Sequence, residues 1–146
     1  PVFQSGDSYP NAVDTSEAEA KAYWFADGKT THVAVDRNDN VLGVYYLRPN
    51  QPPLGAHICN CGYVVANAAR AKGVASLMCE HSQDFAVRNG YRAMQYNLVV
   101  STNTGAVRLW QKHGFEIIAT VPEAFNHKDL GYVDAHIMFK QLVSKA

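Results

Sequence analysis

The spacing of apolar and polar residues predicts strands and helices in mixed order along the chain. Apolar runs and period-two alternation indicate β-strands, and apolar residues three or four apart indicate helices. The predicted strands are His32–Val35, Val41–Leu47, His57–Val65, Ala93–Val100, Glu116–Val121 and Ala135–Leu142. The predicted helices are a short one at Ala20–Trp24, a second at Val74–Val87 and a third from Asn103 to His113.

Capping and turn residues predict where these helices and strands begin and end. Ser16 and Glu19 have the spacing of a capping box, and Asn89–Gly90 ends the second helix. Pro49, Pro52, Pro53 and Gly55 predict a loop, and a second loop is expected from Pro122 to Val133. On the second helix a single buried face is expected to hold Val74, Leu77, Met78, His81 and Phe85.

The order of the elements predicts the fold class. Hairpins come early, and a strand-helix-strand crossover occupies the middle of the chain. This arrangement favours an α/β (α+β) fold whose sheet contains both strand orientations. A chain of 146 residues without a linker or repeat is expected to form one domain, residues 1–146.

Composition narrows the function classes. The 13 Lys and Arg balance the 13 Asp and Glu, so no broad basic field draws nucleic acid or an anionic membrane. No apolar run approaches the roughly 18 residues of a membrane span. Three cysteines, Cys59, Cys61 and Cys79, are an odd and small number. We expect a reduced, cytoplasmic protein without a disulfide framework or a metal site.

The segment Arg70–Ala75 lies between a predicted strand and a predicted helix. Such a loop presents backbone N–H groups and the positive end of a helix dipole to a ligand. Gly73 lets the backbone approach a phosphate closely, and Arg70 and Lys72 add local positive charge. The loop matches neither Gly-x-x-x-x-Gly-Lys-Ser/Thr nor Gly-x-Gly-x-x-Gly. Taken alone it predicts either an anion site or a solvated loop with two surface cations.

A second segment, Asn103–Phe115, follows after one strand. Together the two segments resemble the acetyl-CoA-binding signature of the GNAT superfamily of N-acetyltransferases, closely over residues 57–121. In that pattern a strand precedes Gln/Arg-x-x-Gly-x-Gly/Ala, and a later helix contains Asn-x-x-Ala-x-x-Leu-Tyr-x-Lys-x-Gly-Phe. The matching residues are Arg70, Gly73, Ala75, Asn103, Ala106, Leu109, Lys112, Gly114 and Phe115.

The resemblance implies a GNAT-like mixed sheet, splayed at its centre and flanked by helices. Such proteins begin with a strand and one or two helices, but Pro1–Asp14 has no clear strand signal and only one helix precedes the first hairpin. Either this first strand and helix are missing, or a partner subunit covers the exposed edge. An uncovered edge favours a homodimer.

The resemblance also implies a cofactor, acetyl-CoA, and the residues that bind it. The pyrophosphate of coenzyme A would lie on the backbone of the loop, and the pantetheine arm would bond the main chain around Tyr63 and Val65. Asn103 would bond that arm, and Lys112 would reach toward the nucleotide end. The loop residues so implied are Arg70, Ala71, Lys72, Gly73, Val74 and Ala75.

The groups that move protons are less clearly indicated. Many members of the family have Tyr where this chain has Trp110, and an indole does not give up its proton at useful pH, so Trp110 is assigned to packing or cofactor shape. Because His57–Val65 contains no carboxylate, the expected base is a water relayed through His57 or Tyr63, although His57 could equally be a strand-edge residue without a role. Asn97 would orient the substrate or bond the acyl oxygen, unless it merely ties two strands together.

Three residues are expected to bind the acceptor. Tyr46 and Arg48 end a strand that leads toward the cleft, and an aromatic wall with one Arg suits a small carboxylate-bearing amine. Asn97 is the third. The stretch Asn97–Trp110 is similar to the GNAT branch of fungal acetyltransferases of proline analogues.

The predicted function is therefore acetyl transfer from acetyl-CoA to the primary or secondary amine of a small molecule, such as an amino acid, by direct transfer. Three alternatives stay open. The chain could be a non-catalytic coenzyme A-binding module, it could acetylate a protein amine, or its loop could bind a nucleotide.

Overall fold

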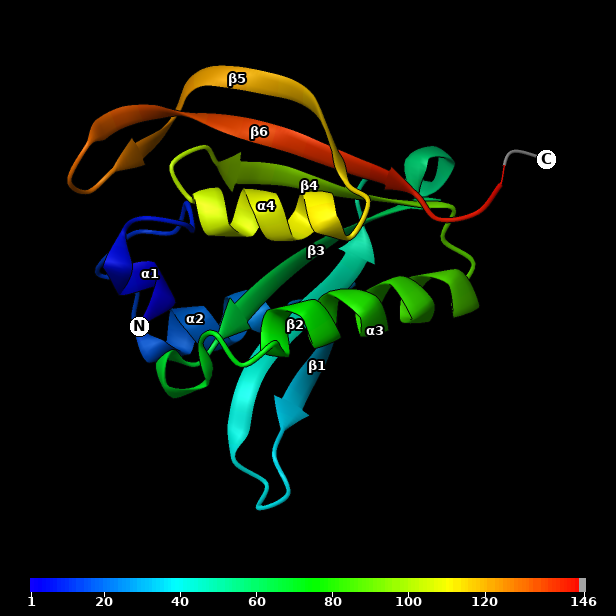
Figure 1. The fold of residues 1–146 in the computed structure, drawn as a ribbon, viewed down its shortest axis with the longest axis horizontal. Helices are drawn as coiled ribbons and strands as arrows, with labels where there is room; N and C mark the ends of the chain where they lie inside the picture. Colours follow the sequence, from blue (N-terminus) through cyan, green and yellow to red (C-terminus); the bar gives the residue numbers. More distant parts are fainter. Residues whose placement is uncertain (145–146) are drawn as a thin grey trace. The chain divides into compact units, whose positions relative to one another are not determined.

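The computed structural model describes residues 1–144. Helices and strands follow one another in the mixed order that the sequence predicts (Figure 1). In chain order they are α1 Val2–Ser5, α2 Glu17–Trp24, β1 Thr30–Val35, β2 Val41–Pro49, η1 Pro53–Gly55, β3 Ile58–Val65, η2 Asn67–Ala69, α3 Val74–Arg88, β4 Ala93–Val100, α4 Thr104–Lys112, β5 Glu116–His127 and β6 Gly131–Gln141.

The six strands form one mixed sheet in the order β1-β2-β3-β4-β6-β5. Pairing is antiparallel in β1–β2, β2–β3 and β5–β6, and parallel in β3–β4. The parallel register is short, because it joins Ile58–Asn60 to Ala93–Gln95 and goes no further. The predicted mixed sheet flanked by helices is confirmed.

The chain divides into two compact units. One holds Pro1–Tyr23 and Tyr96–Phe139, and the other holds Trp24–Gln95 and the segment that begins at Lys140. Strand β4 contributes residues to both units, with the boundary after Gln95. The sequence-based expectation of one domain stays a prediction.

The β1–β2 hairpin forms where alternating apolar residues flank a polar turn. In that turn the Asp36 carboxylate accepts hydrogen bonds from the amides of Asn38 and Asn40, at 2.8 and 3.0 Å. Asp39 takes the left-handed backbone conformation, with φ of 62°, which Asp tolerates better than most residues. The predicted hairpin is confirmed, and β2 continues to Pro49.

Helix α3 packs against β2 and β3 (Figure 1). The predicted face of α3 is buried only in part, because Val74 and Met78 are buried whereas Leu77 is 61% exposed. Met78 lies against Gly43 of β2, where a Cβ would be only 2.8 Å from the Met78 methyl group. The buried residues of α3 are Val74, Met78, Cys79, Ser82 and Ala86.

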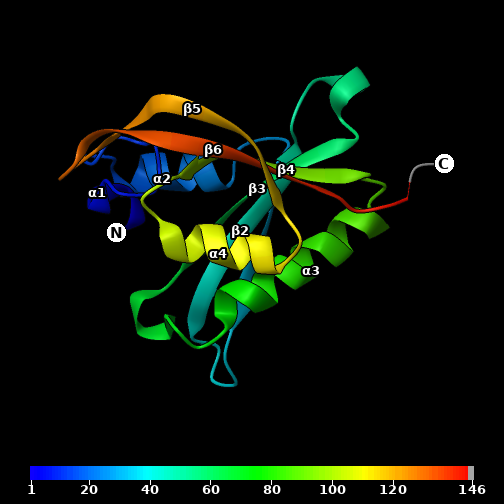
Figure 2. The same cartoon turned by 45° about the horizontal axis from the view of Figure 1, so that its top comes forward.

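Strands β5 and β6 run side by side as a long hairpin (Figure 2). The predicted loop from Pro122 to Val133 is wrong, because β5 continues to His127 and β6 begins at Gly131. The register shifts between Val121 and Phe125, so Pro122, which has no N–H to donate, lies in an irregularity of the strand. Within it, the amide of Glu123 donates to the Asp134 carboxylate at 3.0 Å.

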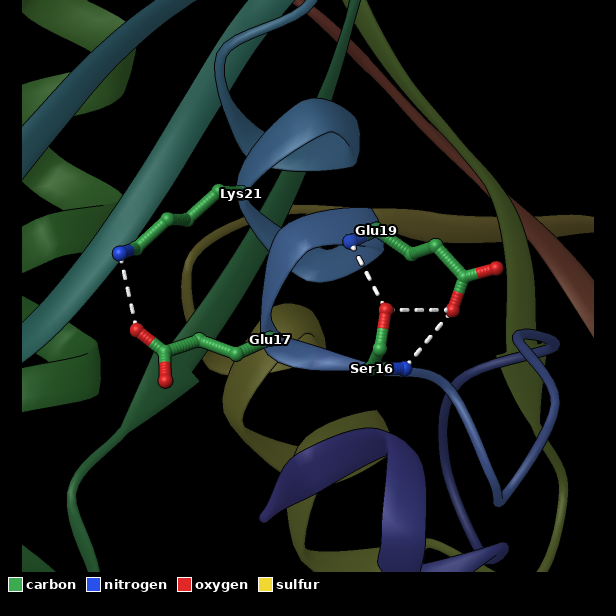
Figure 3. A network of polar contacts seen from close by, with 4 residues as sticks. All are labelled: Ser16, Glu17, Glu19 and Lys21. Atoms are coloured by element: carbon green, nitrogen blue, oxygen red, sulfur yellow. Dashed lines mark hydrogen bonds and ion pairs between the residues drawn. The ribbon is translucent and has the colours of Figure 1, made fainter.

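The predicted capping box begins α2 (Figure 3). The Glu19 carboxylate accepts from the amide and hydroxyl of Ser16, at 2.8 and 2.7 Å, and the Glu19 amide donates back to the Ser16 hydroxyl at 3.2 Å. The one-turn helix α1 was not predicted. Of the described residues before Thr30, none forms a strand.

Candidate functional site

The predicted phosphate loop opens α3. Gly73 is the N-cap of this helix, with φ of +79° and no side-chain cap, and the first bond within the helix runs from the Leu77 amide to the Gly73 carbonyl at 3.0 Å. The first turn of a helix leaves its amide N–H groups without partners inside the helix. In α3 the first turn starts at Val74. The N–H groups of this turn and the positive end of the helix dipole therefore favour an anion bound in front of Gly73.

The loop itself is open on its outer side. Arg70, Ala71, Lys72 and Gly73 are all exposed, whereas Ala69 before them is buried and anchors the segment. Ala71 takes a left-handed φ of 59°, an uncommon conformation for a residue with a side chain. No atom lies within 4 Å of the position that a Cβ on Gly73 would occupy. The loop therefore has room for a ligand.

Tyr63 and Val65 lie on β3, the strand that leads into the loop. The register of β3 with β2 continues to Val65, opposite Gly43. In the part of the chain that the structure describes, its register with β4 stops at Asn60. Main-chain groups beyond Asn60 that a neighbouring strand does not bond must find other partners.

The side chain of Tyr63 points to α3. Its hydroxyl lies 2.6 Å from the Ser82 hydroxyl and 3.7 Å from the Met94 sulfur. The same side of β3 carries Cys59 and Cys61, both buried free thiols. Burial, with the neighbouring Cys59, raises the pKa of the Cys61 thiol well above its usual value, so Cys61 is not an activated nucleophile.

Tyr46 and Arg48 lie on the opposite side of β2 from Tyr45, whose hydroxyl reaches His81 of α3 at 2.7 Å. Their cross-strand neighbours on β3 are Gly62 and Asn60 respectively. The structure therefore brings Tyr46 and Arg48 together, but it does not bring them together with Tyr63.

Asn60 links the strands on this side. It is 5% exposed, accepts from the Tyr46 hydroxyl at 3.4 Å and donates to the Gln95 carbonyl at 3.0 Å. Buried Asn with both ends bonded fixes the relative position of three strands, β2, β3 and β4. Asn60 was not predicted as a site residue, although a polar residue inside an apolar strand was a usable signal.

Lys29 completes the cluster around Tyr46. Its ammonium lies 4.2 Å from the centroid of the Tyr46 ring, and the Trp24 ring packs edge-on against the same ring at 5.4 Å. Burial, and then the charge of Arg48, lower the pKa of Lys29 to about 8. Lys29 was not predicted as a site residue, because only the pairing of Thr30 with Leu47 brings it near Arg48.

His57 was predicted to begin the strand His57–Val65, but β3 begins at Ile58 and leaves His57 just outside it. It is exposed, and its carbonyl accepts from the Arg92 amide at 2.8 Å. His57 stands at the start of β3, whereas the loop follows its end, roughly 25 Å of extended chain away. Strand geometry therefore does not place His57 on the same face as Cys59 and Tyr63.

The remaining predicted site residues belong to the unit that contains α4. Asn97 is exposed on β4, while Val99, two residues on, is buried. Asn103 caps α4 as predicted, because its side-chain oxygen accepts from the Ala106 amide at 3.3 Å. Its side-chain amide nitrogen is the group that could donate to a ligand.

The last two of these residues lie on α4. Lys112 is exposed in its last turn. Trp110 is 9% exposed and packs against Tyr96 at 5.1 Å, and Tyr96 stacks on Phe115 at 4.3 Å. Trp110 thus takes part in an aromatic core.

Two further properties bear on the kind of site. None of the helices in residues 1–144 has the length and apolar character that a membrane crossing requires. Across the same residues, no three or more His, Cys, Asp or Glu side chains gather in a way that could hold a metal ion.

Comparisons with known proteins agree with this geometry. The chain matches the acetyltransferase (GNAT) family over residues 4–115. It is 29% identical to the N-acetyltransferase aca1 of Schizosaccharomyces pombe, over 92% of this chain and 72% of that protein. A GCN5-related N-acetyltransferase from Kribbella flavida has the same fold, with a TM-score of 0.89 and 41% identity over 96% of this chain and 85% of that one.

One further solved structure was determined with a ligand. YncA, described as a putative acetyltransferase of Salmonella typhimurium, was solved with its cofactor acetyl-CoA. It shares the fold with a TM-score of 0.80, at 22% identity over 95% of this chain and 81% of that one.

The fold, the loop before α3 and these matches define an N-acetyltransferase. The chain belongs to the acetyltransferase (GNAT) family. The family predicted from Arg70–Ala75 followed by Asn103–Phe115 is thereby confirmed.

Proposed function

We propose that this protein transfers the acetyl group of acetyl-CoA directly to the amine of a small molecule, such as an amino acid. The observation that carries the proposal is the exposed loop that ends in Gly73 and opens α3, with room for an anion before the helix. Membership of the GNAT family and the acetyl-CoA complex of the Salmonella typhimurium relative support the choice of acetyl-CoA.

In this proposal the pyrophosphate of coenzyme A lies on the backbone of Arg70–Ala75. Arg70 and Lys72 add charge-assisted contacts to it. The main chain at Tyr63 and Val65 bonds the pantetheine arm, because the β3–β4 register ends before these residues. Asn103 and Lys112 contribute further polar contacts, and Trp110 shapes the site through its packing.

When bound, acetyl-CoA supplies the acetyl group as a reactive thioester. The chain must position the acceptor amine, accept its proton and stabilise charge on the acyl oxygen. Asn97 is proposed to donate its amide to the acyl oxygen or the substrate. A water relayed through His57 or Tyr63 is proposed as the base, and Tyr46 and Arg48 are proposed to contact the acceptor.

Three sequence-based expectations stay proposals. These are a small-molecule acceptor rather than a protein amine, a cytoplasmic location and a homodimer. A non-catalytic coenzyme A-binding module is the second candidate, and the packing of Trp110 among Tyr96 and Phe115 favours it, because this position then offers no acid. Release of free thiol from acetyl-CoA by any amine acceptor separates the two functions.

The loop assignment is tested by a matched pair of glycine substitutions at the two ends of α3. Gly73 and Gly90 have φ of +79° and +84°, and both have open space where a Cβ would lie. Gly73→Glu and Gly90→Glu therefore carry the same backbone strain, roughly 1 kcal/mol. We expect acetyl-CoA affinity, measured by calorimetry, to fall at least tenfold in Gly73→Glu only. Equal affinity in both variants would remove the loop from the site.

A further inference from the structure

We propose that the acceptor is an amine that carries a carboxylate, and that Lys29 and Arg48 together hold this carboxylate beside the ring of Tyr46. Lys29 thereby becomes a substrate-binding residue that the sequence did not indicate. The inference rests on the proposed function, because it names the substrate class of that acetyltransferase.

The hairpin register places the two cations beside each other. Thr30, the first residue of β1, pairs with Leu47, and Lys29 and Arg48 are the next residues outward on the two chain segments. The Lys29 ammonium lies over the Tyr46 ring, and Tyr46 and Arg48, two residues apart on β2, project from the same face of the sheet. Burial, and then the nearby charge of Arg48, lower the pKa of Lys29, in keeping with this placement.

The ring of Tyr46, over which the Lys29 ammonium lies, is held in place by its neighbours. Gly62, opposite Tyr46, has no side chain, and a Cβ there would lie 2.6 Å from Cε1 of the Tyr46 ring. The ring can therefore lie over β3, and its hydroxyl donates to Asn60 at 3.4 Å. Trp24 packs against the ring at 5.4 Å. The fixed ring holds the Lys29 ammonium in place, so a small anion binds between Lys29 and Arg48 at low entropic cost.

The electrostatics favour an anionic ligand. Lys29 is partly buried and Arg48 is exposed, so each remains reachable from solvent. The titratable groups that face Lys29 from β2 are Tyr46 and Arg48. A carboxylate between Lys29 and Arg48 would offset their mutual repulsion and accept charge-assisted hydrogen bonds from both. It would also raise the pKa of Lys29, because an opposite charge favours the protonated amine.

The first test compares acids with their amides as acceptors. Glycine, L-alanine and L-proline are paired with glycinamide, L-alaninamide and L-prolinamide, and thiol release is followed for each. The variants are Lys29→Met and Arg48→Met, with Arg37→Met in the exposed hairpin turn as the charge-matched control. For wild type, each acid is expected to have a kcat/KM about tenfold or more above that of its amide. This preference is expected to be lost in Lys29→Met and Arg48→Met and kept in Arg37→Met.

The second test needs no turnover. In protein labelled with 13C at lysine Cε, the pKa of Lys29 is measured by NMR with and without an excess of each acid and each amide. We expect at least one acid to raise the pKa of Lys29 in wild type and not in Arg48→Met, with no shift for its amide. An unchanged pKa with every acid, or equal turnover of acids and amides, would overturn the inference.

Failure of the two proposals can be told apart. Acetyl-CoA affinity is measured on the same samples. If acetyl-CoA does not bind, the proposed function fails, while the NMR titration still decides whether Lys29 and Arg48 hold a carboxylate. If acetyl-CoA binds and acids and amides react equally, only the carboxylate inference fails.

Discussion

The ring of Tyr46 occupies the space that a side chain on Gly62 would need. A Cβ at Gly62 would lie 2.6 Å from Cε1 and 3.0 Å from the hydroxyl oxygen of Tyr46. Because Tyr46 is also 5% exposed and bonded to Asn60, it has little freedom to move aside. The absence of a side chain at Gly62 thus sets the position of the Tyr46 ring, over which the Lys29 ammonium lies.

Gly62→Ala is expected to destabilise the protein by about 1–3 kcal/mol, since overpacking forces the Tyr46 ring from its position. Gly105→Ala is the control, because Gly105 lies in α4 and a Cβ there meets no atom within 4 Å. That change is expected to be neutral or to stabilise by up to about 1 kcal/mol. Urea denaturation of both variants measures the difference, and equal stabilities would contradict the packing described.

Tyr63→Phe tests a hydroxyl that has two proposed uses. Loss of its 2.6 Å contact with the Ser82 hydroxyl is expected to cost about 1 kcal/mol, with a coupling to Ser82→Ala in a double-mutant cycle. If the hydroxyl also relays the proton, kcat falls by about tenfold or more and its pH profile shifts. A kcat unchanged in Tyr63→Phe would remove Tyr63 from the catalytic candidates and leave its structural role.

His32 is expected to make stability depend on pH. Its ring stacks on Tyr45 at 4.9 Å and meets His81 of α3 at 5.4 Å, and its buried Nδ1 has no hydrogen-bond partner among the described residues. Burial, and then the charge of His81, lower the pKa of His32 below its ordinary value of 6.5.

The sign follows from proton uptake. As pH falls through about 6.5, the unfolded chain binds a proton at this histidine before the folded chain does, so the free energy of unfolding falls. His32→Phe keeps the ring packing and removes the titration, so its stability is expected to decline less between pH 7 and 5 than that of wild type. His57→Gln, at an exposed histidine, is the control and should keep the wild-type slope. A steeper decline in His32→Phe would refute this role.

Local sequence signals were enough to predict most of the helices and strands. Glycine, asparagine and capping residues act over a few positions, and this is why Asn103 at the start of α4, Asn89 at the end of α3 and the Ser16–Glu19 box were predictable. The family was predictable from two segments in order, Arg70–Ala75 and Asn103–Phe115.

Features that depend on pairing between distant residues were not predictable. Pro122 suggested a loop, but a register shift in β5 accommodates it and the strand continues to His127. Leu77 fits the apolar period of α3, but the packing of that helix on β2 and β3 leaves it exposed. Lys29 becomes a candidate only when the pairing of Thr30 with Leu47 brings it near Arg48.

Acetyl transfer itself is the most direct test of the proposed function. Wild type, Gly73→Glu and Gly90→Glu are incubated with acetyl-CoA and the panel of amino acids, with free thiol followed by absorbance and the acetylated product identified by mass spectrometry. We expect wild type and Gly90→Glu to release thiol and form an N-acetyl amino acid in equal amounts, and Gly73→Glu to be at least tenfold slower at limiting acetyl-CoA. Tight binding of acetyl-CoA by wild type without product from any amino acid would contradict it.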